Sequence, residues 1–241
     1  MTGLVEVLVL TPADAQRAAA GGADRVEVIG SLEFGGMSPD PELVEKVRDA
    51  VDLEIRVRLR LREGFSTDGG EFARLRGLAA SYLDAGADGI VMGFLNGREE
   101  IDTEVLAGLL AGVDWPWTFH RAFDSVLDPA LAWTTLLPAP GLDQVQSAGS
   151  PRGLAYGLDE LIAFARSDRR IAALAMAGGG LLPEHVPWLA RARITAFHLA
   201  EQVRPHGSFR EYVDPDLVGS WRRLVDAEVA RAYAGRTTPA Q

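Results

Sequence analysis

The segment that decides the fold runs from Ala20 to Val28 and reads AGGADRVEV. A helix-like segment stops at its glycines, which can adopt the left-handed conformation that ends helices, and an apolar strand follows at once. The pattern recurs as AGADGIV at residues 85–91 and, in weaker form, as PGLDQV at residues 140–145. Such repeats are typical of a helix that turns directly into a parallel strand.

Strands and helices are expected to alternate along the whole chain. Hydrophobic periodicity predicts strands near residues 4–9, 25–29, 53–61, 88–92, 116–120, 143–147, 171–176 and 194–198. It predicts helices near residues 12–20, 40–50, 70–85, 102–112, 128–137, 158–167, 184–191 and 215–233. Eightfold alternation over 241 residues predicts a single-domain (β/α)₈ barrel, the TIM barrel, over residues 1–241. The tail at about residues 234–241 is expected to be disordered.

A doubly wound sheet of the Rossmann type is the alternative to a barrel. It would need Gly-x-Gly-x-x-Gly after the first strand, and residues 8–12 read LVLTP instead. The sequence therefore favours the barrel, whose longer connections after the strands share one face, where active sites are built.

Composition limits the classes of function. The chain is 47% hydrophobic and 24% charged, which is typical of a soluble globular protein, and its net charge of −10 argues against nucleic-acid binding. No apolar stretch approaches the roughly 18 residues that span a membrane, and no basic leader precedes the first strand, so a cytoplasmic location is expected. The absence of cysteine excludes disulfides, thiolate catalysis and thiolate-held zinc or copper.

The third predicted strand alternates apolar residues with charged ones, as EIRVRLRLR at residues 54–62. In a barrel the apolar face packs under the helices and the other face lines the lumen, so some of these arginines should be interior. Because a buried guanidinium needs a partner, Glu6 and Glu27 of the first two strands are expected to pair with arginines of the third strand. A buried ion-pair layer that only fills the lumen is the alternative for Arg56 and Arg58.

The upper ends of the strands carry residues suited to anions. Arg60 and Arg62 end the third strand, where a planar guanidinium could hold a carboxylate or a phosphate. Three glycines at residues 178–180 follow the seventh strand, where barrels often bind phosphate on backbone N–H groups; a tight turn is the alternative.

Two histidines stand at strand ends. His120 lies in TFHRAFD at residues 118–124, which puts an imidazole, a guanidinium and a carboxylate within five residues. It would act as a general acid–base oriented by Asp124 or Glu27, and a structural histidine beside an ion pair is the alternative. His198 ends the eighth strand. His185 and His206 fall in a helix start and a loop, and are expected to face solvent.

Taken together, these segments resemble the copper homeostasis protein CutC family over residues 4 to about 230. The similarity is carried by GGADRVEV at 21–28, LEFGGMSP at 32–39, GADGIVMG at 86–93, TFHRAFD at 118–124 and MAGGG at 176–180. The positions that match the polar motif residues of the family are Glu6, Arg25, Glu27, Arg60, Arg62, His120, Arg121, Asp124, Ser147 and His198.

The resemblance implies a TIM barrel, a role in copper homeostasis through copper binding or trafficking in the cytoplasm, and assembly into homo-oligomers. The chain is a divergent member, because Leu8 and Ile29 stand where the family commonly has cysteine. Cuprous ion prefers thiolate and thioether ligands, so their absence weakens copper as a cofactor. A Cu(II) or zinc site would use His120, His198 and a carboxylate, although the arginines at the same mouth would repel a cation.

The alternative function is an enzyme or binding protein for a small anionic metabolite, phosphorylated or carboxylated, at the C-terminal mouth of the barrel. The residues expected to hold this ligand are Glu6, Arg25, Arg60, Arg62, Arg121, Ser147, Gly178, Gly179, Gly180 and His198, and the catalytic residues would be His120, Asp124 and Glu27. Schiff-base chemistry is not expected, since the single lysine, Lys46, falls in a helix. A barrel with a purely structural polar lumen is the third interpretation. Neither nucleic acid nor membrane is expected as a partner.

Overall fold

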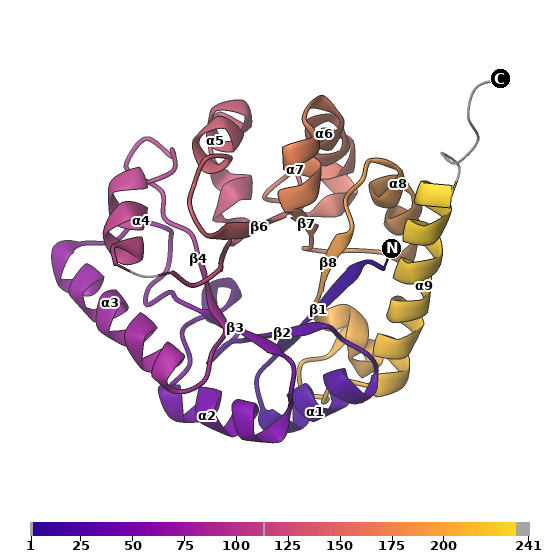
Figure 1. Cartoon of the computed structure of the whole chain (residues 1–241), viewed down its shortest axis with the longest axis horizontal. Coiled ribbons are helices and arrows are strands. Elements are labelled where there is room, and N and C mark those ends of the chain that lie inside the picture. Colours follow the sequence, from indigo (N-terminus) through magenta and orange to yellow (C-terminus); the bar gives the residue numbers. More distant parts are fainter. Residues whose placement is uncertain (1, 113, 235–241) are drawn as a thin grey trace.

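The computed structural model describes residues 2–112 and 114–234. Eight parallel strands close into a barrel in the order β1 to β8, and helices surround it (Figure 1). The strands are β1 (Leu4–Val9), β2 (Arg25–Val28), β3 (Glu54–Arg58), β4 (Gly89–Met92), β5 (Trp117–Phe119), β6 (Leu142–Ser147), β7 (Ala175–Ala177) and β8 (Ala196–Leu199). The predicted TIM barrel is confirmed.

The helices follow the strands in sequence and form the outer layer. They are α1 (Pro12–Ala20), α2 (Pro41–Ala50), α3 (Gly69–Asp84), α4 (Thr103–Leu110), α5 (Pro129–Leu136), α6 (Leu154–Ser167), α7 (Arg169–Leu174), α8 (Val186–Arg191) and α9 (Pro215–Ala234). The last helix lies beside α1 and α8, and the barrel closes where β8 pairs with β1 (Figure 1). The predicted disordered tail lies outside the described residues, except for Ala234, which ends α9.

The repeat that predicts the fold has one structural role in its two clear copies. Gly22 and Gly86 have φ angles of +88° and +92°, the left-handed conformation that lets each helix turn into a strand. The aspartate two residues later accepts a hydrogen bond from a backbone N–H of the neighbouring strand: Asp24 from Val5 at 2.7 Å, and Asp88 from Ile55 at 2.8 Å. The repeated sequence thus forms repeated turns at the base of the barrel.

The strand predicted at residues 171–176 is wrong for most of its length. Residues 169–174 form α7, and β7 occupies only Ala175–Ala177. The side chain of Asp168 accepts a hydrogen bond from the N–H of Arg170 and so begins the helix. A short apolar run does not by itself distinguish a buried helix from a buried strand.

The two faces of the barrel strands have different chemistry. Outward-facing side chains such as Val5, Val26, Ile55 and Val57 are fully buried beneath the helices. The lumen instead holds charged groups, including three buried arginines of the third-strand segment, Arg56, Arg58 and Arg60. The prediction that some arginines of residues 54–62 are interior is therefore confirmed, whereas Arg62 of the same alternation is exposed. No helix in the described part of the chain is long and apolar enough to cross a membrane.

Candidate functional site

A layer of ion pairs fills the lower lumen. Arg25 donates from Nε to Glu6 at 2.6 Å, and Arg58 donates from Nε to Glu27 at 2.6 Å. The predicted pairing of Glu27 with an arginine of the third strand is therefore found. The same prediction for Glu6 is wrong, because Glu6 and Arg25 are register partners on the adjacent strands β1 and β2.

Deeper in the lumen, Arg56 contacts the carboxylates of Glu54 and Asp143. Arg25 lies 3.6 Å from each of the same two carboxylates. Arg25 and Arg56 are thus structural neighbours below the mouth, and neither lines the cavity at the mouth.

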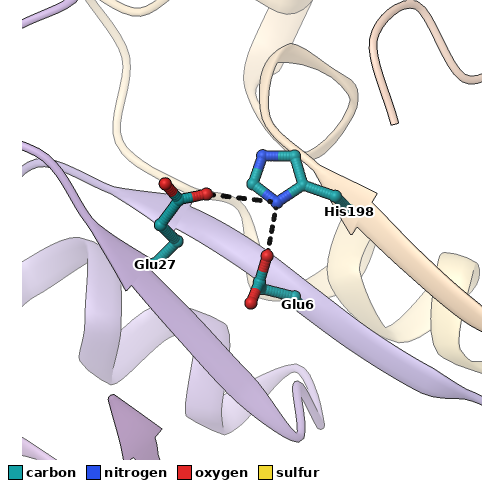
Figure 2. A group of neighbouring side chains, drawn as sticks. All are labelled: Glu6, Glu27 and His198. Carbon is teal, nitrogen blue, oxygen red and sulfur yellow. Dashed lines mark hydrogen bonds and ion pairs between the residues drawn. The ribbon is translucent and has the colours of Figure 1, made fainter. Parts of the chain in front are cut away.

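Above this layer, His198 lies between two glutamates (Figure 2). Its Nδ1 is 2.7 Å from Glu6 Oε1 and 3.6 Å from Glu27 Oε2. The amide of Gln146 donates to both carboxylates, at 3.1 Å and 2.9 Å. Nε2, the other ring nitrogen of His198, points away from both glutamates (Figure 2).

The glutamates set the charge of His198. Burial alone would lower the pKa of His198, but the hydrogen bond to Glu6 and the charges of Glu27 and Glu6 raise it above its ordinary value. Burial alone would raise the pKa of Glu6, but Arg25 and His198 lower it strongly. The pair is therefore an imidazolium and a carboxylate, and Nδ1–H of His198 donates to Glu6.

A cavity of about 470 Å³ opens above these residues at the C-terminal ends of the strands. Its lining includes Arg58, Arg60, His120, Gln146 and His198. The cavity thus brings together side chains of β3, β6 and β8 with the segments that follow β3 and β5. This is the face at which TIM barrels carry their active sites.

Arg60 is the unusual member of this lining. Its side chain donates to backbone carbonyls, those of Phe34, Arg62 and Gly64, and its guanidinium lies 4.9 Å from the ring centre of Phe65. Among the described residues, no carboxylate forms an ion pair with it. Burial and the neighbouring charge of Arg58 lower the pKa of Arg60, and the charge of Glu63 opposes this shift; a guanidinium stays protonated in proteins in either case.

His120 occupies a different environment from His198. Its Nδ1 accepts a hydrogen bond from the N–H of Ala122 at 3.1 Å, and Nε2 is buried without a partner among the described residues. Burial, followed by the charges of Arg58 and Arg60, lowers the pKa of His120 well below its ordinary value. The pKa values of the two histidines of the mouth are therefore shifted in opposite directions, that of His120 downward and that of His198 upward.

The predicted orientation of His120 by Asp124 or Glu27 is wrong. Asp124 instead accepts from Arg121 at 2.8 Å, from the hydroxyl of Ser147 at 2.7 Å and from the N–H of Ala148. Glu27 is engaged with Arg58, Gln146 and His198. Because Asp124 is bound on several sides, it positions Arg121 at the cavity edge and does not reach the imidazole.

Arg62 does not join Arg60 in a clamp, contrary to the expectation. Its side chain is 41% exposed, contacts Asp68, and lies 2.6 Å from Glu71 at the start of α3. The reason is that β3 ends at Arg58, so strand alternation no longer governs the direction of Arg62. Arg62 is absent from the cavity lining.

The three glycines after β7 have different surroundings. Gly178 and Gly179 line the cavity, whereas Gly180 does not. Gly179 has a φ angle of +84°, and a Cβ there would lie 2.5 Å from Cζ of Arg121. The glycine therefore leaves room for that guanidinium. The glycines are followed by a 3₁₀ turn, Pro183–His185, that runs directly into α8.

The other two histidines lie outside the site. His185 is buried, and its Nδ1 accepts from the N–H of Leu182 at 3.1 Å, so the expectation that it faces solvent is wrong. His206 is exposed, as expected.

The predicted metal site of His120 and His198 is not assembled. In the described part of the chain, the group with ligand atoms close enough to share an ion is Glu6, Glu27 and His198, all within 4.8 Å of one another. Each of these atoms already contacts an arginine, an imidazole or an amide. Two guanidinium groups next to the carboxylates oppose a cation, and the group contains no soft donor for cuprous ion.

Gln146 and Phe65 are among the lining residues that the sequence did not indicate. Gln146 bridges Glu6 and Glu27, and Phe65 lies against both Arg60 and His120, with its ring centre 5.6 Å from that of His120. The alternation along β6 could have indicated Gln146, but a register shift between β5 and β6 obscures which residues face inward. Phe65 lies in a loop, for which strand periodicity offers no signal.

A closed parallel barrel with a charged lumen and cationic groups at its mouth defines a TIM-barrel protein with a site at the C-terminal face. Within that class, the CutC family model matches residues 3–203, and the chain belongs to the CutC family.

Similar proteins agree with this assignment. The family protein CutC of Klebsiella pneumoniae is 30% identical over 244 residues, which covers 96% of each chain. The human copper homeostasis protein cutC homolog is 34% identical over 81% of this chain and 72% of its own length. The crystal structure of CutC from Streptococcus agalactiae superposes with a TM-score of 0.73 at 22% identity, over 81% of this chain and 97% of that one, and shows the same fold.

Proposed function

We propose that this CutC family member binds a small phosphorylated or carboxylated metabolite at the C-terminal mouth of its barrel. The observation that carries the proposal is Arg60, a buried guanidinium in the cavity wall that no described carboxylate pairs with. Backbone carbonyls accept from its donors, but its charge has no carboxylate partner among the described residues, so an anion from solution is the natural counter-charge.

Comparison with the other buried arginines supports this interpretation. Arg25 pairs with Glu6, Arg58 pairs with Glu27, and Arg204 pairs with Asp14 at 3.1 Å. Arg60 is also buried, although less deeply than Arg25 and Arg204, and it lines the cavity without an ion pair to a described carboxylate. Its planar fork of donors matches the oxygens of a carboxylate or a phosphate.

His198 adds a second positive group to the proposed site. Nδ1–H of His198 donates to Glu6. Nε2 lies on the opposite side of the ring, and His198 lines the cavity. An anion between Arg60 and His198 would meet two cations in a partly desolvated cavity, where charge interactions are stronger than in water.

The test is calorimetric titration of the protein with a panel of small phosphorylated and carboxylated metabolites. Arg60→Met removes the proposed anion partner and keeps the apolar length of the side chain. Arg62→Met is the matched control, because Arg62 belongs to the same segment but points away from the cavity. Binding should weaken by at least about tenfold in Arg60→Met, the loss expected for a charge-assisted contact, and stay unchanged in Arg62→Met. Equal affinities in the wild type and in Arg60→Met would refute the proposal.

A part in copper homeostasis is the second candidate, and it is supported by the names of relatives such as the human copper homeostasis protein cutC homolog. Copper would be the cargo in this case, and the residues available to it are Glu6, Glu27 and His198. Titration with Cu(I) and Cu(II) of wild type and His198→Ala tests this candidate. Copper binding that is lost in His198→Ala would support it. A cytoplasmic location remains part of the proposal and can be checked by cell fractionation.

A further inference from the structure

The hydrogen bond at Nδ1 determines where His120 carries its proton. His120 follows β5 directly and caps the 3₁₀ turn at Arg121–Ser125, where Nδ1 accepts from the N–H of Ala122 at 3.1 Å. An imidazole nitrogen that accepts a hydrogen bond carries no proton, so a neutral His120 is protonated at Nε2. The fold therefore presents His120 as a hydrogen-bond donor, not as a base.

The surroundings of the ring hold it in this position. A Cβ at Gly93 would lie 2.6 Å from Nδ1 and 2.8 Å from Cε1 of His120, so the absence of a side chain there provides the space for the Nδ1 edge. Phe65 packs on the ring at 5.6 Å between centres. Burial and the charges of Arg58 and Arg60 keep the imidazole neutral.

The donor at Nε2 lacks an acceptor. His120 is 1% exposed, and Nε2 is buried with no hydrogen-bond partner among the described residues, although the side chain lines the cavity. A buried donor without an acceptor destabilises the ligand-free protein. A ligand that brings an acceptor oxygen to this position would remove this destabilisation.

We propose that His120 donates from Nε2–H to a carbonyl oxygen of the ligand, so that the site selects small anions with a carbonyl group beside their phosphate or carboxylate. This inference rests on the anion site proposed above. Arg60 carries a full charge and suits the anionic group, whereas the neutral His120 suits a neutral acceptor.

The neighbouring donors favour a carbonyl over a hydroxyl at this position. Arg58 and Arg60 are close enough to His120 for their charges to act on it, and guanidinium groups have donors only. A carbonyl oxygen can only accept hydrogen bonds, so it matches the donors of Arg58, Arg60 and His120 in the cavity wall. A hydroxyl group would bring a proton of its own, which the guanidinium groups and Nε2–H could not accept.

Two variants of His120 separate its two hydrogen bonds. In His120→Asn the side-chain oxygen occupies the place of Nδ1 and can still cap Ala122, since asparagine is a favoured capping residue, but the donor at Nε2 is lost. In His120→Gln the longer amide places an N–H near the position of Nε2 and loses the cap. Circular dichroism would show that both variants keep the fold.

The first measurement is ¹⁵N-edited NMR of the histidine side chains in the wild-type protein at neutral pH. We expect His120 to be neutral and protonated at Nε2. A proton on Nδ1, or an imidazolium, would overturn the inference without reference to any ligand.

The second measurement compares matched ligands by calorimetry: pyruvate against lactate, and dihydroxyacetone phosphate against glycerol 3-phosphate. In at least one pair the carbonyl compound should bind about tenfold more tightly than its hydroxyl counterpart. This is the difference in affinity expected for one additional hydrogen bond. This preference should disappear in His120→Asn and be kept in His120→Gln.

The outcomes separate the two proposals. If anions bind in an Arg60-dependent way but the members of each pair bind equally, the carbonyl inference is wrong and the anion site stands. If no anion of either pair binds, or Arg60→Met leaves binding unchanged, the anion site fails and the carbonyl inference fails with it.

Discussion

Glu6 and His198 are register partners across the seam where the first strand meets the last, and Nδ1 of His198 donates to Glu6 at 2.7 Å. The same carboxylate accepts from Arg25 at 2.6 Å through its other oxygen. One buried glutamate thus connects β8, β1 and β2 at the closure of the barrel, and it also fixes the charge of a histidine at the mouth.

The glutamate should be essential for stability. Glu6→Gln keeps the shape of the side chain but leaves Arg25 and His198 without their carboxylate in a fully buried position. Removing one partner of such a buried pair should lower the free energy of unfolding by about 3–5 kcal/mol. Urea denaturation measures this change. Glu42→Gln is the control, because Glu42 pairs with Lys46 on the surface of α2, and its stability should stay at the wild-type value. A Glu6→Gln protein as stable as this control would contradict the closure role.

Stability should depend on pH through both members of the pair. The folded pKa of His198 is raised above 6.5, so its contribution is fully present below that value and is lost as pH rises through the folded pKa. The folded pKa of Glu6 is lowered from 4.5, so its contribution is present above 4.5 and is lost as pH falls below it.

These two groups together give greatest stability between about pH 4.5 and 6.5. Denaturation midpoints across this range check the prediction, and the loss of stability on the alkaline side should become smaller in His198→Gln. An alkaline limb that is identical in His198→Gln would show that His198 is not the group responsible.

Arg60 should lower the stability of the ligand-free protein relative to a variant with an apolar side chain at this position. Its guanidinium is buried without a carboxylate, next to the charge of Arg58. Its donors are met by backbone carbonyls, yet replacing a buried charge that lacks an ion-pair partner by an apolar side chain of similar length is often stabilising. We expect the melting temperature of Arg60→Met to equal or exceed that of the wild type while anion affinity falls. Arg58→Met should instead lower the melting temperature, because it removes the guanidinium that pairs with the buried carboxylate of Glu27. A marked loss of stability in Arg60→Met would identify Arg60 as a structural residue.

Gly179 should be required for the position of Arg121. A Cβ at Gly179 would lie 2.5 Å from the guanidinium carbon, whereas a Cβ at Gly180 would meet no atom within 4 Å. Both residues have positive φ, so alanine at either position should cost about 1–2 kcal/mol of backbone strain. Only Gly179→Ala should displace Arg121 from Asp124 and lower anion affinity severalfold. Calorimetry on the two variants checks this, and equal affinities would show that Arg121 does not contribute to binding.

The sequence predicts the barrel well because its evidence is local. The glycine and aspartate of each repeat act within a few residues, and both clear copies form the same turn, as Gly22 with Asp24 and Gly86 with Asp88 show. Strand alternation likewise predicts that some arginines of residues 54–62 are interior, and Arg56, Arg58 and Arg60 are buried. Both signals depend on regular backbone geometry, which the sequence pattern reports directly.

The partners within the site could not be predicted to the same extent. Glu6 pairs with Arg25 and His198, and these contacts depend on register between strands rather than on alternation within one strand. Arg62 and Phe65 lie beyond the end of β3, where the periodic pattern no longer applies. The tautomer of His120 depends on a backbone N–H two residues later, in a 3₁₀ turn that the sequence did not indicate.

The most direct test of the central claim is the melting temperature of metal-stripped protein with phosphorylated and carboxylated metabolites on one side and Cu(I), Cu(II) and Zn(II) on the other. A ligand that binds the native state raises the melting temperature by mass action. The anion site predicts stabilisation by at least one anion in the wild type and in Arg62→Met, with none in Arg60→Met. Stabilisation by copper alone, abolished in His198→Ala and unaffected in Arg60→Met, would contradict it.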